Sequence, residues 1–244
     1  MNTEMSVPLL SGVIAIGSAA IAVWGQFRVT RLNHDIEKFK LKAEDDRNSA
    51  HYREPLARSA ADLQSRLFNI LAQDFVGKFM IRGTPREQTY ALSNTVFLFA
   101  QFFAWTEATR LEIQFISLDA DTKTQALSAL QSRIYSLLQS DDFSASFRLF
   151  TGEQRAIGER MLVSRQSGLR CVGYSEFLAE NRVSNDALLG ELHANVESLK
   201  TMLIEATPRL VALQHALIEL IDHLDPNCVR FPKEERSKWQ RKKV

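Results

Sequence analysis

Cysteine, glycine and proline are all scarce in this sequence. Its 244 residues include only two cysteines, Cys171 and Cys228, together with ten glycines and six prolines. Two such thiols form neither a disulfide framework nor the cysteine spacing of a zinc site, and they agree with a reducing compartment. With few glycines, few prolines and few runs of β-branched residues, the composition predicts helices throughout, that is, an all-α fold.

Recognisable catalytic and cofactor motifs are also missing. No P-loop, GxGxxG, Ser-His-Asp or Cys-His pattern appears, so the sequence assigns no catalytic residue and no cofactor. The formal net charge is only +1, which gives no global argument for nucleic-acid binding. Apolar residues make up 45% of the chain, which is enough for the core of one domain of ordinary size.

Charged side chains are absent from one long stretch, Met5–Phe27. A bilayer core requires about 20 mostly apolar residues in a helix, and residues 7–27 meet that length. Pro8 near the start and Trp24 near the end suit a transmembrane helix. The alternatives are a signal peptide cleaved after Ala20–Ala22, which would lack the usual basic start, and an unusually long charge-free core helix.

The charges that flank this stretch predict its orientation. No lysine or arginine precedes it, whereas Arg28, Arg31, Lys38, Lys40 and Lys42 follow closely. The positive-inside rule therefore predicts residues 1–6 as a short extracytoplasmic tail, with the N-terminus outside and the body of the chain in the cytoplasm.

A stripe of residues at spacings of three and four continues from the predicted membrane helix into a juxtamembrane helix or linker at residues 28–50. Its side chains are small within the predicted membrane helix and large and apolar within residues 28–50. The stripe contains Ser11, Ala15, Ser18, Ala22, Val29, Leu32, Ile36 and Phe39. Small residues let helices approach closely in a membrane, and large apolar ones form a coiled-coil seam in water, so the stripe predicts a parallel homodimer. The alternatives are a chance recurrence of small residues and docking of the stripe onto the chain's own bundle.

Residues 51–228 are predicted to form a cytoplasmic bundle of several helices. Apolar residues at helical spacing indicate helices over about 55–80, 87–117, 121–137, 151–165, 175–180, 184–199 and 207–224. Pro55, the capping-box pattern Thr151–Gln154 and Pro208 suit helix starts. The segment Val96–Trp105 is apolar on nearly every side. Because it is too short for a second membrane span, we expect it at the centre of the bundle.

The segment Phe147–Arg160 is the densest group of unusual residues. Free backbone amides at a helix start, together with nearby arginines, predict an anion or ligand site. The candidate residues are Arg148, Gly152, Glu153 and Arg155. The alternative is an ordinary helix cap followed by a helix that packs tightly through Gly158.

Two further patterns lie near the C-terminus. His215, Glu219 and His223 are spaced to share one helical face, but that face is turned away from the leucine stripe, so no metal site is assigned. The tail at residues 229–244 is basic, and it predicts contact with an anionic membrane leaflet, with RNA binding as the alternative. The predicted membrane-contacting residues are Trp24, Lys238, Trp239, Arg241, Lys242 and Lys243.

Three segments of the chain resemble a group of uncharacterised bacterial proteins. The segments are Tyr-Arg-Glu-Pro-Leu at 52–56, Leu-Gln-Ser-Arg-Leu at 63–67 and Phe-Arg-Leu-Phe-Thr-Gly-Glu-Gln-Arg-Ala-Ile-Gly at 147–158. In that group, such segments follow a single N-terminal hydrophobic helix. The resemblance covers residues 52–158 and implies a bacterial source, hence the inner (plasma) membrane, and one helical domain. It implies no activity, so no catalytic residue is carried over.

Taken together, these patterns predict a single-pass membrane protein whose cytoplasmic bundle is an interaction or sensing module for an unidentified protein partner. One alternative is a membrane-tethered enzyme, with a site among Arg53, Glu54, Glu107, Arg110, Glu153 and Arg155. Another is a small-ligand sensor with an apolar cavity lined by Phe99, Phe103 and Trp105.

Overall fold

A computed structural model describes the backbone of residues 6–115, 122–165 and 168–240. Within these ranges it describes no side chains for residues 6–23, 25, 38–39, 41–51, 112–115 and 122–124. The chain divides into two compact units, residues 1–51 and residues 52–244. The backbone of the first helix, α1 (Ser6–Ala72), is helical through the boundary between them.

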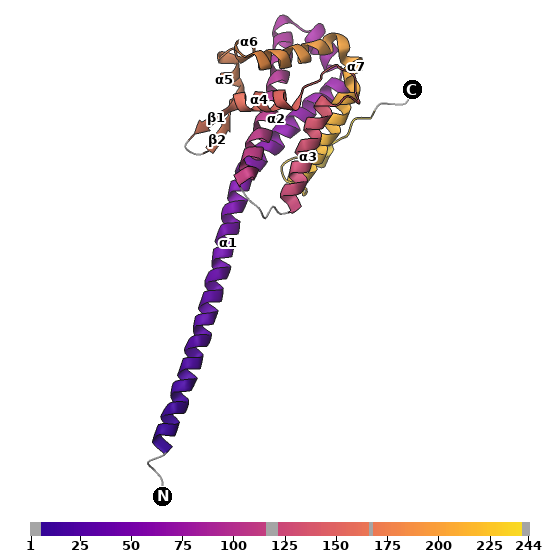
Figure 1. Cartoon of the computed structure of the whole chain (residues 1–244). Helices are drawn as coiled ribbons and strands as arrows, with labels where there is room; N and C mark the ends of the chain where they lie inside the picture. Colours follow the sequence, from indigo (N-terminus) through magenta and orange to yellow (C-terminus); the bar gives the residue numbers. More distant parts are fainter. Residues whose placement is uncertain (1–5, 116–121, 166–167, 241–244) are drawn as a thin grey trace. The chain divides into compact units, whose positions relative to one another are not determined.

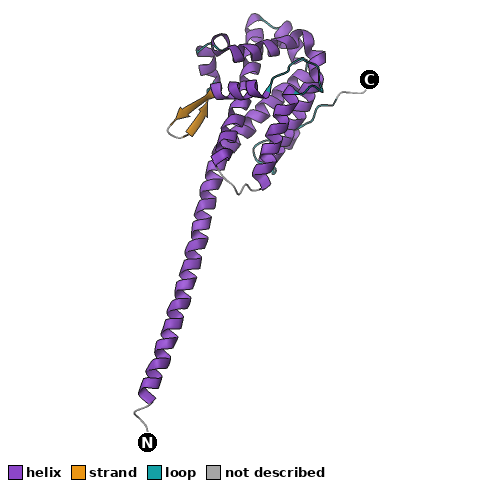
Figure 2. Cartoon of the chain, in the orientation of Figure 1, coloured by secondary structure: helices purple, strands orange, loops and turns teal. Residues whose placement is uncertain are grey.

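Helices make up nearly all of the regular structure, as the composition predicts (Figures 1 and 2). After α1 come η1 (Val76–Ile81), α2 (Pro85–Phe115), α3 (Thr122–Gln139), α4 (Thr151–Met161), β1 (Leu162–Arg165), β2 (Gly168–Cys171), α5 (Tyr174–Ala179), α6 (Arg182–Asn185), α7 (Ala187–Leu224) and η2 (Lys233–Glu235). Here η1 is a π-helix and η2 a short 3₁₀ helix. In residues 52–244, α2 contacts α3, α4, α5 and α7, and α3 lies along α7 (Figure 1).

The predicted transmembrane helix at residues 7–27 falls almost wholly outside the described side chains, which in that segment are those of Trp24, Gln26 and Phe27. Among the residues that the structure does describe, no helix combines the length and the apolar character that crossing a membrane requires. The prediction that a helix starts at Pro55 is wrong, because Pro55 lies inside α1. Residues 42–50 include good helix formers such as lysine, alanine, glutamate and arginine, and a proline removes only one helical hydrogen bond.

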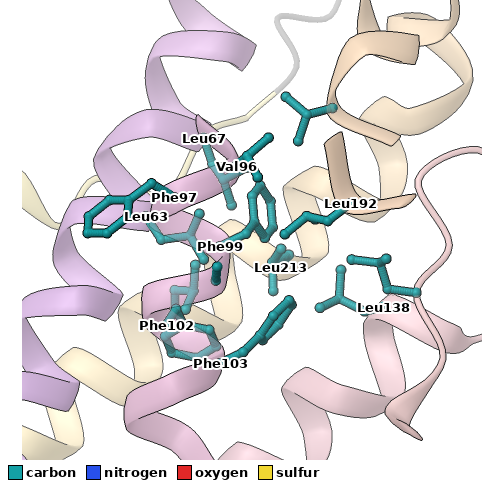
Figure 3. Close-up of a cluster of buried hydrophobic side chains, with 14 of the residues drawn as sticks. Leu63, Leu67, Val96, Phe97, Phe99, Phe102, Phe103, Leu138, Leu192 and Leu213 are labelled. Atoms are coloured by element: carbon teal, nitrogen blue, oxygen red, sulfur yellow. The ribbon is translucent and has the colours of Figure 1, made fainter. Parts of the chain in front are cut away.

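The centre of α2 lies in the hydrophobic core, as its apolar run predicts. Phe99, Phe102 and Phe103 have no exposed surface (Figure 3). The centre of the Phe99 ring lies 5.1 Å from that of Phe147. Leucines from α1, α3 and α7 surround these rings (Figure 3). The start of α2 has a clear local cause: the Glu87 carboxylate accepts hydrogen bonds from both the amide and the hydroxyl of Thr84, at 2.8 Å each.

Helix α4 crosses α2 at Gly158, which is buried. A Cβ atom at Gly158 would lie 2.6 Å from the Phe103 carbonyl oxygen, and backbone cannot move aside cheaply. We therefore predict that Gly158→Ala lowers the free energy of unfolding by about 1–3 kcal/mol, as overpacking typically does. Gly152→Ala, on the same helix, is the matched control: nothing lies within 4 Å of its Cβ, so stability should stay the same or rise by about 0.5 kcal/mol. Urea unfolding measures both, and equal stabilities for the two variants would contradict the tight crossing.

A β-hairpin follows α4, where the sequence predicts a helix as far as residue 165. That prediction is wrong: α4 ends at Met161, and β1 pairs antiparallel with β2 in the register Leu162 with Cys171 (Figure 2). The Val172 amide then donates to the Met161 carbonyl at 2.8 Å, which extends the pairing by one step. A hairpin of four-residue strands has too few alternating residues to show a period of two in the sequence.

Three other helix boundaries differ from the predictions. The helix expected over 55–80 ends at Ala72, and Asp74 adopts a positive φ of 56° before η1 begins. The two helices expected over 184–199 and 207–224 form one element, α7, with a kink at Met202 rather than a start at Pro208. Asp186 caps α7, because its carboxylate accepts hydrogen bonds from the amides of Leu188 and Leu189. The predicted start of the helix over 121–137, Asp121, lies outside the described residues.

Candidate functional site

The described part of the N-terminal unit carries an exposed apolar stripe on α1. Val29, Leu32 and Ile36 are 57%, 57% and 49% exposed, although each is a large apolar residue. Closer to the predicted membrane segment, Trp24 and Phe27 are exposed as well, and the Arg28 guanidinium lies 4.8 Å from the centre of the Trp24 ring. The remaining residues of the predicted seam lie outside the described side chains; they are Ser11, Ala15, Ser18, Ala22 and Phe39.

The predicted anion site at the start of α4 is occupied by the protein's own groups. The Glu153 carboxylate accepts a hydrogen bond from the Phe150 amide at 2.8 Å, so the capping residue is Phe150 rather than Thr151. Gln139 Oε1 accepts from the amide and hydroxyl of Thr151. Of the other candidates, Gly152 is exposed, Arg148 pairs with Asp141 at 2.8 Å, and Arg155 is exposed with its guanidinium 5.8 Å from the Tyr135 ring centre. The carboxylate in this position disfavours an anion.

Among the charged residues of the enzyme alternative, Glu54 and Glu153 belong to separate local arrangements. Glu54 pairs with Arg58 and Arg230, and Glu153 caps α4. Glu107 is fully buried and pairs with Arg110, whose Nε donates to Glu107 Oε2 at 2.8 Å. Such pairing is what a structural role in fixing helix register requires.

A buried tyrosine, Tyr135, lies close to part of this group. Burial raises the pKa of Tyr135 well above its ordinary value, and the charge of Glu107 raises it further, while Arg155 and Arg110 act in the opposite direction. In the part of the chain that the structure describes, the Tyr135 hydroxyl has no hydrogen-bond partner. A neutral phenol beside an ion pair supplies no base or nucleophile at pH 7.

The aromatic residues of the ligand-sensor alternative fill the core instead of lining a described cavity. Phe99 and Phe103 are fully buried, with ring centres 6.2 Å apart, and Trp105 is half-buried against the same cluster.

The C-terminal segment is held against the bundle as far as residue 239. Arg236 is buried and pairs with Asp222 and Asp225 at 2.9 Å and 2.7 Å. Burial alone would raise the pKa of Asp225, but hydrogen bonds from the amides of residues 229–231 and the charge of Arg236 lower it below its ordinary value. The segment borders a groove of about 260 Å³ beside α1 and α7, lined in part by Gln64 and Phe231.

This attachment includes two of the residues predicted to contact the membrane. Lys238 pairs with Glu219 at 2.8 Å. The half-buried Trp239 is held through its backbone: its amide donates to Gln214 Oε1, and its carbonyl oxygen lies 2.8 Å from His215 Nε2. Arg241, Lys242 and Lys243 lie outside the described residues. Two members of the histidine pattern on α7, His215 and Glu219, take part in these contacts. Among the described residues, no group of three His, Cys, Asp or Glu side chains is arranged to hold a metal ion.

Two arginines are buried in the bundle without a carboxylate partner in the described part of the chain, and neither is among the predicted site residues. Arg209 on α7 has no exposed surface. Its guanidinium donates to five backbone carbonyls, those of Leu137 (2.7 Å), Leu138 (2.8 Å), Ser140 (3.1 Å), Ser144 (2.7 Å) and Ser146 (3.3 Å). Burial lowers the pKa of Arg209, and Arg148 lowers it further. Because a guanidinium has five N–H donors, Arg209 is fully bonded, and it ties α7 to the end of α3 and the following loop.

The second buried arginine, Arg66 on α1, is less completely bonded. It is 8% exposed, and its terminal nitrogens donate to Thr95 Oγ1 (2.9 Å), Asn94 Oδ1 (2.7 Å) and the Ala91 carbonyl (3.5 Å). The Phe75 ring covers the guanidinium, with 4.2 Å between the Cζ atom and the ring centre. The signal in the sequence was a lone cation one turn after Leu63, on the apolar face of the helix.

Hydroxyl groups and aromatic rings surround Arg66. Burial lowers the pKa of Arg66, whereas the phenols of Tyr90 and Tyr174 act to raise it. The Tyr90 and Tyr174 rings meet edge to face at 6.4 Å, and the Tyr174 hydroxyl lies 2.9 Å from Ser93 Oγ.

Comparison of the chain with protein-family models, with curated proteins and with solved structures finds no significant match.

Proposed function

We propose that this chain is a single-pass membrane protein of the bacterial inner membrane, with its N-terminus outside and its helical body in the cytoplasm as an interaction or sensing module. The charge-free stretch Met5–Phe27, followed by a run of basic residues, supports the anchor and its orientation. The exposed Trp24 with Arg28 beside it suits the headgroup level. The pairing of the charged residues within the bundle favours a module over an enzyme.

The observation that carries the interaction role is the exposed stripe of Val29, Leu32 and Ile36 on α1. We propose that it pairs with the same stripe of a second copy. The spacing assigns Val29 and Ile36 to a positions and Leu32 to a d position of a heptad, the arrangement that a parallel two-stranded coiled coil buries. Burying three such side chains supplies roughly 5–9 kcal/mol before the costs of association, and the membrane anchor lowers those costs because it holds both copies in one plane.

Charge complementarity supports a parallel and in-register pair. With this heptad assignment, Asp35 occupies a g position and Lys40 the following e position, and both side chains are exposed. In a parallel coiled coil, a g residue lies opposite the next e residue of the partner helix. Asp35 would therefore meet Lys40 of the second copy, with opposite charges.

Cysteine crosslinking tests this pairing. In a variant without the native thiols (Cys171→Ala, Cys228→Ser), we expect Leu32→Cys to form a disulfide-linked dimer in membranes under mild oxidation. His34→Cys is the matched control, since the f position of the heptad points away from the partner helix. Equal crosslinking at the two positions, or none at Leu32→Cys, would contradict the seam.

Charge reversal tests the register in the same background. Asp35→Lys places like charges opposite each other and should reduce crosslinking at Leu32→Cys, whereas adding Lys40→Asp should restore it. Failure of the second change to restore crosslinking would contradict the parallel register.

A further inference from the structure

The groove beside α1 and α7 lies where the C-terminal segment meets these two helices. Ala61, Gln64 and Phe68 recur at helical spacing on α1 and form one wall, and Phe231 with residues 234–237 forms another. Its volume is about 260 Å³. Small-molecule sites typically have volumes of about 300–1,000 Å³, so this groove suits a ligand at the small end of that range.

One amide oxygen in the wall of the groove has no partner in the described chain. The Gln64 side chain lines the groove, and Gln64 is only 3% exposed. Its Nε2 donates a hydrogen bond to the Glu235 carbonyl at 3.1 Å, but no described residue donates to its Oε1. Because buried polar atoms normally have a hydrogen-bond partner, the Gln64 oxygen requires a donor from a molecule in the groove.

The charges along the groove favour a cation over an anion. Arg236 lines the groove, but its Nη1 and Nη2 atoms donate to two carboxylates and two backbone carbonyls at 2.7–3.0 Å. These bonds use all four terminal N–H groups, so the guanidinium fork has no hydrogens left for an anionic ligand. Glu234 and Glu235 also line the groove, and neither carboxylate forms an ion pair with a described residue. Their charges attract a positively charged ligand.

We propose that this groove binds a small organic ammonium compound, that is, a primary amine on an apolar body. The ammonium group donates a hydrogen bond to Gln64 Oε1 and lies beside the carboxylates of Glu234 and Glu235. The half-buried side chains of Phe68 and Phe231 contact the apolar body, and their ring faces attract a cation. The site lies within residues 52–244, so this proposal stands independently of the membrane anchor and of the pairing of α1.

Calorimetric titration of the full-length protein in mild detergent with benzylammonium chloride tests the proposal, with sodium chloride at equal ionic strength as the reference. Benzyl alcohol is the neutral probe of similar shape. We expect saturable binding of benzylammonium and binding of benzyl alcohol that is weaker by about tenfold or more. Equal affinities for the two probes, or heats that do not saturate, overturn the proposal and leave the groove to solvent.

Variants localise the binding. The double variant Glu234→Gln/Glu235→Gln removes both carboxylates from exposed positions and should weaken benzylammonium binding about tenfold. Gln64→Met removes the amide oxygen and should also weaken binding about tenfold, the effect of one lost hydrogen bond to a charged group.

The matched control is Glu191→Gln/Glu205→Gln, which makes the same change of charge at two exposed positions on α7. Glu205, the nearer of the two along the helix, precedes the groove residue Ile221 by 16 positions, or about 24 Å of helix, so the control should leave affinity unchanged. Unchanged affinity in Glu234→Gln/Glu235→Gln, or an equal loss in the control, places the amine elsewhere and overturns the proposal, even if Gln64→Met proves unfolded.

Discussion

Replacing Arg209 with methionine is expected to lower the free energy of unfolding by about 3–5 kcal/mol, the range for disrupting a buried polar network. Methionine keeps most of the side-chain length, so the main loss is the guanidinium. Five carbonyl oxygens of residues 137–146 then lose a charged donor, and of these the Leu138 oxygen also accepts from the Leu149 amide at 3.0 Å. The measurement is urea unfolding of the full-length protein in mild detergent, followed by circular dichroism.

The comparison variant is Arg133→Met on α3. Arg133 also pairs with α7, through Glu219, but its side chain is 52% exposed. Loss of this pair should therefore lower the free energy of unfolding by no more than about 1 kcal/mol. Arg209→Lys should remain destabilising, since an ammonium offers three donors where five acceptors are placed. A cost for Arg209→Met no greater than that for Arg133→Met would show that the carbonyls find other donors and would contradict the role assigned to Arg209.

Introducing a charge at the centre of the predicted membrane segment is expected to have the largest effect on location. Ile16→Lys costs about 2.5–3.5 kcal/mol of insertion free energy, against roughly 2–5 kcal/mol supplied by the valines, leucines and isoleucines of the segment. We therefore expect most of the variant protein to leave the membrane fraction. Asn33→Lys, an exposed position on α1 beyond the segment, is the control and should remain membrane-bound. Retention of Ile16→Lys in membranes after carbonate extraction would contradict a transmembrane helix that depends on this segment.

Much of the fold follows from local sequence rules, and the exceptions have physical causes. The buried centre of α2 was predicted because Val96–Trp105 is apolar on nearly all sides and too short for a bilayer. The hairpin Leu162–Cys171 was not predicted, because its short strands directly continue an amphipathic helix. Pro55 lies inside α1 and does not begin a helix, since proline marks a helix start only when the residues before it are poor helix formers.

The candidate sites were less predictable than the fold. The apolar stripe on α1 could be read directly, because exposure of Val29, Leu32 and Ile36 follows from a polar helix with one apolar face. The groove beside α1 and α7 could not, since it joins residues 171 positions apart, Gln64 and Glu235, and depends on tertiary packing. The arginine and glycine residues of α4 suggested a ligand site, but Glu153 and Gln139 satisfy the backbone groups that a ligand would have used.

The central proposal is a single membrane anchor with the helical body in the cytoplasm. Its most direct test is the topology of the chain in bacterial cells. A single cysteine is placed at Ser237, which is exposed, in the variant without native thiols, and a membrane-impermeant maleimide is applied to intact spheroplasts. The proposal predicts that the protein sediments with membranes and that Ser237→Cys reacts only after permeabilisation, which places the body in the cytoplasm. Reaction in intact spheroplasts, or recovery of the protein in the soluble fraction, would contradict it.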